Sequence, residues 1–153
     1  MPDITYKIID IDNERVSGIQ LISKGQVLMN IIGVYLPFYD ESVDQIELYA
    51  ESLQCLQSVL ELHQGEPLVI VGDMNAALPQ KQQLSFNWHQ LRPFNADSLI
   101  LYDFVCDNDM CIGNFGYTQT MNYMYFKGVN RTYIIHVFIP RYLMYMYYFR
   151  LST

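Results

Sequence analysis

The segment Leu68-Val-Ile-Val-Gly-Asp-Met-Asn75 constrains the fold of this chain more than any other. A short, β-branched apolar run that ends in glycine is typical of a buried strand. Side chains at positions i and i+2 of a strand share a face, so Asp73 and Asn75 are expected to emerge together where the strand ends. Open α/β sheets bind ligands at this end of their strands. The segment therefore predicts an α/β fold with a polar site at the end of a central strand.

A carboxylate beside a neutral amide suits phosphate chemistry. The Asp73 carboxylate can hold Mg²⁺ or polarise a water, and the Asn75 amide can donate a hydrogen bond to an oxyanion. The same pattern also has a simpler interpretation, because an aspartate that follows a buried strand more often caps the next turn. The segment by itself leaves both interpretations open.

The elements expected before this segment are two hairpin strands and one amphipathic helix. Lys24-Gly25 is a turn signal between strands expected at Ser17–Ser23 and Gln26–Leu36, and Ile4–Ile11 is a further candidate strand. Ser42-Val-Asp-Gln45 fits a capping box, and apolar residues then recur at three- and four-residue spacing as far as Leu60. His63 lies in the last turn of this helix, and Gly65 ends it. The order strand, helix, strand predicts a mixed sheet.

The second half of the chain contains a loop, a helix and two late strands. A polar loop is expected over Ala76–Ala96, with Trp88 packed on the core, and a helix over Ser98–Met110. Strands are expected over Asn122–Phe126 and Thr132–Ile139, joined by a turn at 127–130.

Two flanking segments add a family resemblance. Ile31-Ile-Gly-Val-Tyr-Leu-Pro37 lies upstream and Arg131-Thr-Tyr-Ile-Ile-His-Val-Phe-Ile-Pro140 downstream. In this order the three segments resemble the endonuclease/exonuclease/phosphatase superfamily, above all the endonuclease domains of non-LTR (LINE-type) retrotransposons. The resemblance covers residues 14–140, a partial domain, and leaves 141–153 as an unassigned aromatic tail. It implies an α/β fold of the α+β type, in which two mixed sheets form a sandwich covered by helices.

The resemblance also implies a reaction and roles for four residues. A water would attack a phosphodiester in line while Mg²⁺ steadies the developing charge. Asp73 would serve the metal or orient the water, Asn75 would bind the nucleophile or phosphate, and His136 and Tyr35 would donate to phosphate oxygens. Without the resemblance, Tyr35 can equally be a half-buried residue at the end of a strand. His136 can equally be a histidine in the core.

Two departures from the family pattern predict impaired catalysis. Ile135 occupies the position where the family has an aspartate, and the strands that carry a metal-binding Glu and a catalytic Asn in the family have no counterpart before Val16. Loss of one such group typically costs about 10²–10⁴ in rate. Mg²⁺ binding is therefore expected to be weak or absent. A sheet that lacks those strands is also expected to keep an unpaired edge, through which the chain could self-associate.

Charge and cysteine content limit the partners and the compartment. The formal net charge is −7 and the Lys and Arg residues are scattered, so DNA is a partner by resemblance only. Two alternatives stay open: a non-catalytic remnant or interaction module, and a phosphoesterase that acts on a small substrate. Three cysteines without a Cys-x-x-Cys pair, and the lack of a basic and apolar leader, favour an intracellular protein, nuclear or cytoplasmic. The apolar tail is interrupted by His136, Pro140 and Arg141, so no membrane span is expected.

Overall fold

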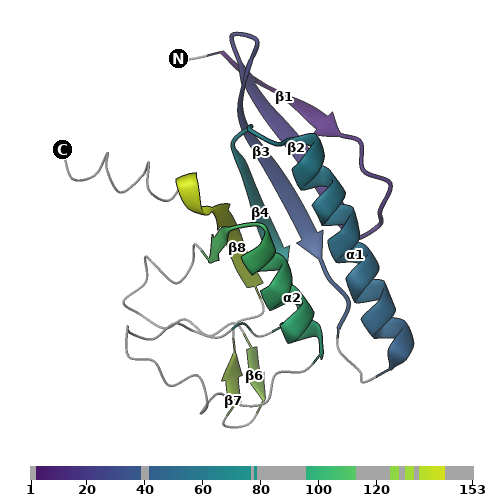
Figure 1. Ribbon diagram of the computed structural model, residues 1–153. Coiled ribbons are helices and arrows are strands. Elements are labelled where there is room, and N and C mark those ends of the chain that lie inside the picture. Colours follow the sequence, from purple (N-terminus) through teal and green to yellow (C-terminus); the bar gives the residue numbers. More distant parts are fainter. Residues whose placement is uncertain are drawn as a thin grey trace, which may run out of the picture.

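The computed structural model describes residues 3–38, 42–76, 78, 96–112, 125–127, 130–132 and 135–143. These residues form a six-stranded sheet, two helices and a separate hairpin (Figure 1). In chain order the elements are β1 (Ile4–Ile9), β2 (Val16–Ser23), β3 (Gln26–Tyr35), α1 (Val43–Leu62), β4 (Leu68–Asp73), α2 (Ala96–Asp107), β5 (Met110–Ile112), β6 (Tyr125–Lys127), β7 (Asn130–Thr132) and β8 (Ile135–Pro140).

The large sheet has the strand order β1-β2-β3-β4-β8-β5. Strands β1, β2 and β3 form an antiparallel meander. The chain then passes through α1 and returns as β4, parallel to β3. Strand β8 lies antiparallel to β4, and β5 lies antiparallel to β8. The expected mixed sheet and α/β class are thus confirmed.

The turn between β2 and β3 follows from two residues. Lys24 has φ 52° and Gly25 has φ 77°. Positive φ at both central positions is the geometry that suits the twist of a two-residue hairpin, and glycine adopts it without a steric penalty. The Lys24-Gly25 turn expected from the sequence is therefore present.

Helix α1 begins where the capping signal places it. The Ser42 side chain accepts a hydrogen bond from the Gln45 backbone N–H at 3.3 Å. One face of the helix is buried through residues such as Tyr49, Leu53 and Leu56. This face packs against apolar side chains of the central strands, and α2 completes the same layer (Figure 1). Both helices thus cover one face of the sheet and leave the core between helices and strands.

The later elements differ from the expectation in two places. Helix α2 ends at Asp107 rather than Met110, because Asp109 takes φ 47° and turns the chain into β5, a strand that the sequence did not indicate. Of the strand expected at Thr132–Ile139, β8 forms Ile135–Pro140 and pairs with β4, while Thr132 belongs to β7, which pairs with β6. Trp88 and most of the 76–96 loop lie outside the described residues, as does the tail after 143.

Gly72 permits the close approach of β3 and β4. It has φ +150°, and a Cβ atom at this position would overlap the Val34 carbonyl oxygen of the neighbouring strand. Backbone cannot move aside as the end of a flexible side chain can. The glycine before Asp73 is therefore required by the packing of the two strands.

We expect Gly72→Ala to destabilise the fold by more than about 2 kcal/mol, through backbone strain and the displaced strand. Gly25→Ala is the matched control, because its positive φ is also strained but nothing lies within 4 Å of the added Cβ. The control should lose only about 1 kcal/mol. Urea unfolding of both variants makes the comparison, and an equal loss in the two would contradict the predicted clash.

A partly buried hydrogen-bond network joins the other end of the sheet to the end of α1. Asn30 is fully buried and donates to the Glu66 carboxylate at 2.8 Å. The Gln20 amide donates to the Asn30 side-chain oxygen and to the same Glu66 carboxylate. The His63 ring nitrogen Nδ1 lies 2.9 Å from the same carboxylate. The hydrogen bonds from Asn30 and His63 lower the pKa of Glu66 from its ordinary value of 4.5. Glu66 therefore stabilises the fold in its ionised form.

A lowered folded-state pKa stabilises the protein fully above the unfolded value and loses that effect as the pH falls through the folded value. We expect Glu66→Gln to lower the free energy of unfolding at neutral pH by about 1 kcal/mol. The difference in the free energy of unfolding between wild type and variant should shrink below pH 4.5, where the wild-type carboxylate protonates. Thermal unfolding across this range measures it, with the exposed Glu47→Gln as the charge-matched control. A gap that stays constant into acid would show that ionisation of Glu66 is irrelevant.

Candidate active site

The sheet register brings the ends of three strands together. Tyr35 on β3 is paired with Asp73 on β4. Asp73 is in turn paired with Ile135 on β8, and Gly72 with His136. Asn75 follows two residues after Asp73. The structure therefore gathers all four residues expected from the sequence at one end of the central strands.

Asp73 and Asn75 build a tight turn. The Asp73 carboxylate oxygen Oδ1 accepts a hydrogen bond from the Asn75 backbone N–H at 3.0 Å. Asn75 has φ 46°, a left-handed conformation that asparagine tolerates better than most residues. Its side-chain Nδ2 donates to the Leu36 carbonyl at 2.8 Å. Both side chains thus hold the turn after β4 and tie it to the chain that leaves β3.

His136 lies in the core. Its side chain is fully buried, and its ring stacks on Phe138 with the centroids 5.8 Å apart and the planes at 12°. The ring nitrogen Nε2 lies 3.1 Å from the Ala76 carbonyl, which can only accept, so Nε2 carries the proton. The Phe138 side chain and the paired Ile70 side chain belong to the core beneath the helices. His136 therefore anchors the turn from the helix-covered face of the sheet.

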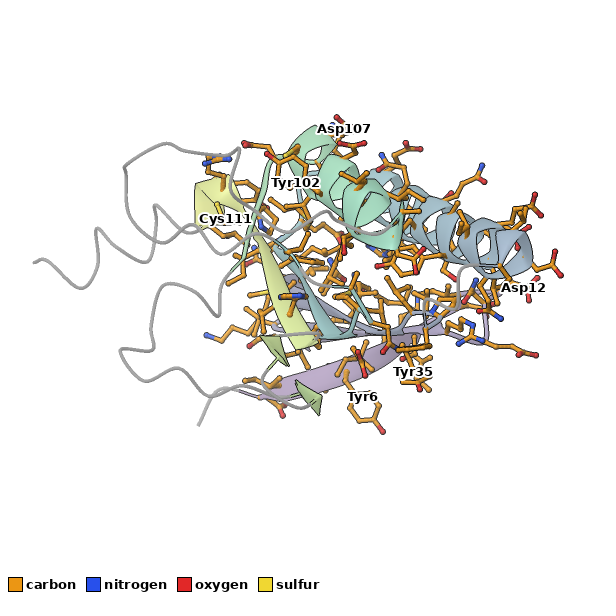
Figure 2. All side chains as sticks on the ribbon, turned by 90° about the horizontal axis from the view of Figure 1, so that it is seen from below. Tyr6, Asp12, Tyr35, Tyr102, Asp107 and Cys111 are labelled. Carbon is orange, nitrogen blue, oxygen red and sulfur yellow. The ribbon has the colours of Figure 1, made fainter. Side chains whose placement is uncertain are left out.

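Tyr35 and Asp73 lie on the other face. Strand alternation places their side chains opposite to Val34 and Ile70, which are buried under α1. Tyr35 is 60% exposed, and Figure 2 shows it on the side of the sheet away from the helices. The four residues are close along the backbone, yet the imidazole of His136 and the Tyr35–Asp73 pair point to different faces.

Tyr49, which the sequence did not single out as a site residue, supports the turn. The Tyr49 hydroxyl donates to the Met74 carbonyl at 2.9 Å, between Asp73 and Asn75. Burial, with the charges of Asp97 and Asp73 nearby, raises the pKa of Tyr49 well above its usual range, so the hydroxyl keeps its proton. Asp97, in the first turn of α2, is only 1% exposed. In the sequence, the only sign of this role was the position of Tyr49 on the inward face of the amphipathic helix.

The described residues contain no group of three or more His, Cys, Asp or Glu side chains that could hold a metal ion. Asp73 brings one carboxylate to the strand ends, and its Oδ1 already accepts from the turn. Mg²⁺ is usually bound through one or two carboxylates together with substrate phosphates. These residues supply one ligand for Mg²⁺ and do not form a complete site.

The comparisons with known proteins give matches in structure only. No family model and no curated sequence matches the chain. The endonuclease domain of TRAS1, a telomere-specific non-LTR retrotransposon, matches with TM-score 0.59 and 12% identity over 91% of this chain and 57% of its own. The Neisseria 3′ phosphatase NExo, bound to a product DNA hairpin, matches with TM-score 0.57 and 15% identity over 93% of this chain and 60% of its own. The Xenopus laevis APE2 catalytic domain matches with TM-score 0.54 and 16% identity over 93% of this chain and 46% of its own.

These neighbours have the endonuclease/exonuclease/phosphatase fold, and the chain shares that fold. The fold includes the endonuclease domain of a non-LTR retrotransposon, which is the type that the sequence motifs resemble. The chain spans 57% and 60% of the length of the first two neighbours. Within the part of the chain that the structure describes, neither helix is long and apolar enough to cross a membrane.

The dual role of Asn75 can be tested by separating its backbone and side-chain contributions. Asn75→Ala should destabilise the fold by about 2 kcal/mol, because it loses the bond to Leu36 and strains a left-handed residue. Asn75→Gly should lose only about 1 kcal/mol, since glycine relieves the strain but does not restore the bond. Chemical denaturation gives both values. If the glycine variant is the less stable of the two, the left-handed conformation is not what this position requires.

Proposed function

We propose that this chain is a partial domain derived from a metal-dependent phosphodiesterase, a DNA endonuclease of the retrotransposon type, and that its catalysis is impaired. The observation that carries the proposal is the Gly72-Asp73-Met74-Asn75 turn, which sits beside Tyr35 in a fold shared with nucleases. By family resemblance, Asp73, Asn75, Tyr35 and His136 are its site residues and Mg²⁺ its cofactor.

The contacts of these residues support the impairment. Asp73 and Asn75 are engaged in holding their turn. His136 is fully buried and bonded to Ala76, so a phosphate in solvent cannot reach its ring without a rearrangement. Ile135, the ladder partner of Asp73, can neither bind a metal nor orient an imidazole. Groups that act as a unit lose most of their effect when one is missing.

The net charge of −7 weakens the case for DNA as a present partner and leaves a small phosphoester as the second candidate substrate. The structural match to a 3′ phosphatase bound to a product DNA hairpin is compatible with monoester hydrolysis, but it does not select a small substrate. A chain that has lost all chemistry and only binds other proteins is the remaining alternative.

The experiment compares wild type with Asp73→Asn on supercoiled plasmid and on p-nitrophenyl phosphate, each with Mg²⁺. We expect no plasmid nicking above the Asp73→Asn background and only weak Mg²⁺ binding by calorimetry, because Asp73 is a single ligand. Nicking that Asp73→Asn abolishes would show that the site is intact. Monoester turnover without nicking would favour the phosphatase.

The proposed origin of the domain can be tested by restoring the residues that the family pattern requires. Ile135→Asp alone should remain inactive, since an added acid near Asp73 has no cation to balance it. The same change in a chain extended with the Glu- and Asn-bearing strands of a structural relative should nick plasmid. The extended chain with Ile135 retained is the control. Failure of the extended, repaired and folded chain to nick would argue against a nuclease origin.

A further inference from the structure

The two faces of the six-stranded sheet differ in what covers them. α1 and α2 pack on one face, whereas no helix of the described chain lies on the other, which we call the open face. Its central row crosses four strands through paired positions, from Ile8 on β1 to Ile19 on β2, Ile31 on β3 and Val69 on β4. Four apolar side chains in register form a continuous hydrophobic ridge.

The β1 end of the open face is strongly exposed. Tyr6 and Ile8 are 71% and 70% exposed, and Ile4 beside them is 52% exposed. Figure 2 shows Tyr6 pointing away from the helices, on the same side as Tyr35. At about 200 Å² for a fully exposed large side chain, these three with Ile19 at 37% and Tyr35 at 60% expose roughly 600 Å² in total. That total lies at the upper end of the range for the largest apolar patch of a typical monomer, about 300–600 Å².

The charge of the open face does not select a partner. Among the side chains that the described strands place on it, Asp73 is the charged one, and it lies at the end of β4. Lys7 is on β1 but alternates to the other face, paired with Gln20. A face of this kind is complementary to another apolar sheet, because two sheets pack at about 10 Å with their side chains interdigitated.

We propose that a second copy of this chain packs on the open face, sheet against sheet. A two-fold dimer uses the same patch on both subunits, and a continuous apolar row satisfies this requirement with itself. Stable interfaces bury about 800 Å² on each partner. The exposed side chains supply most of that area, and the half-buried Ile31 and Val69 supply more.

This inference does not depend on the proposed function, and it differs from association through the edge of β1. Edge pairing adds strands to one sheet, either β1 to β1 in a dimer or β1 to β5 in a polymer, and leaves the open face exposed. Face packing closes at two copies and hides the row from Ile8 to Val69. The two modes therefore respond to different substitutions.

The test is the mass in solution of the full chain, by light scattering or sedimentation equilibrium over a wide concentration range. We expect twice the chain mass of 18.0 kDa for wild type. Ile8→Lys/Ile19→Lys should weaken the dimer at least about a hundredfold, since burial of one isoleucine is worth roughly tenfold or more in affinity. Leu62→Lys/Leu99→Lys is the matched control, because it places the same two charges on exposed helix positions and should remain dimeric.

Circular dichroism confirms that each variant folds, and Tyr6→Lys replaces the double variant if that one does not. A monomeric wild type overturns the proposal, whether the open face stays bare or binds another polypeptide. A dimer or polymer that persists in the folded Ile8→Lys/Ile19→Lys variant also overturns it, because association would then use the sheet edge or another surface.

Discussion

The parallel pairing of β3 and β4 is the constraint on which the rest of the structure depends. The two strands approach so closely that Gly72 must lack a Cβ opposite the Val34 carbonyl. Because they are parallel, the connection between them has to cross the sheet, and α1 does so while covering one face. The same pairing sets Tyr35 beside Asp73, and no helix of the described residues lies on the opposite face of the sheet.

The residues of the candidate site carry structural roles. The Asp73 carboxylate and the Asn75 amide close a turn that Tyr49 supports from α1 and His136 supports from β8. A turn held in this way keeps its shape whether or not its side chains take part in catalysis. The sequence motif can therefore persist for structural reasons alone.

The two faces of the sheet both carry apolar side chains, but they differ in how far these side chains are buried. The helices bury Ile32, Ile70 and Phe138 completely, while Tyr6 and Ile8 on the far side stay largely exposed. A sheet that is apolar on both faces is stable only when both are covered. The proposed second copy of the chain would cover the open face.

The sequence by itself determined the local features. The Lys24-Gly25 turn, the Ser42 cap and the β-branched run before Gly72 each depend on a few adjacent residues, and all three are present. Only the tertiary structure decided the rest. Which late residues pair with β4, and whether His136 faces solvent or the core, depends on a strand more than sixty residues away. Periodicity reports which side chains share a face, but the partner strand decides which face is buried.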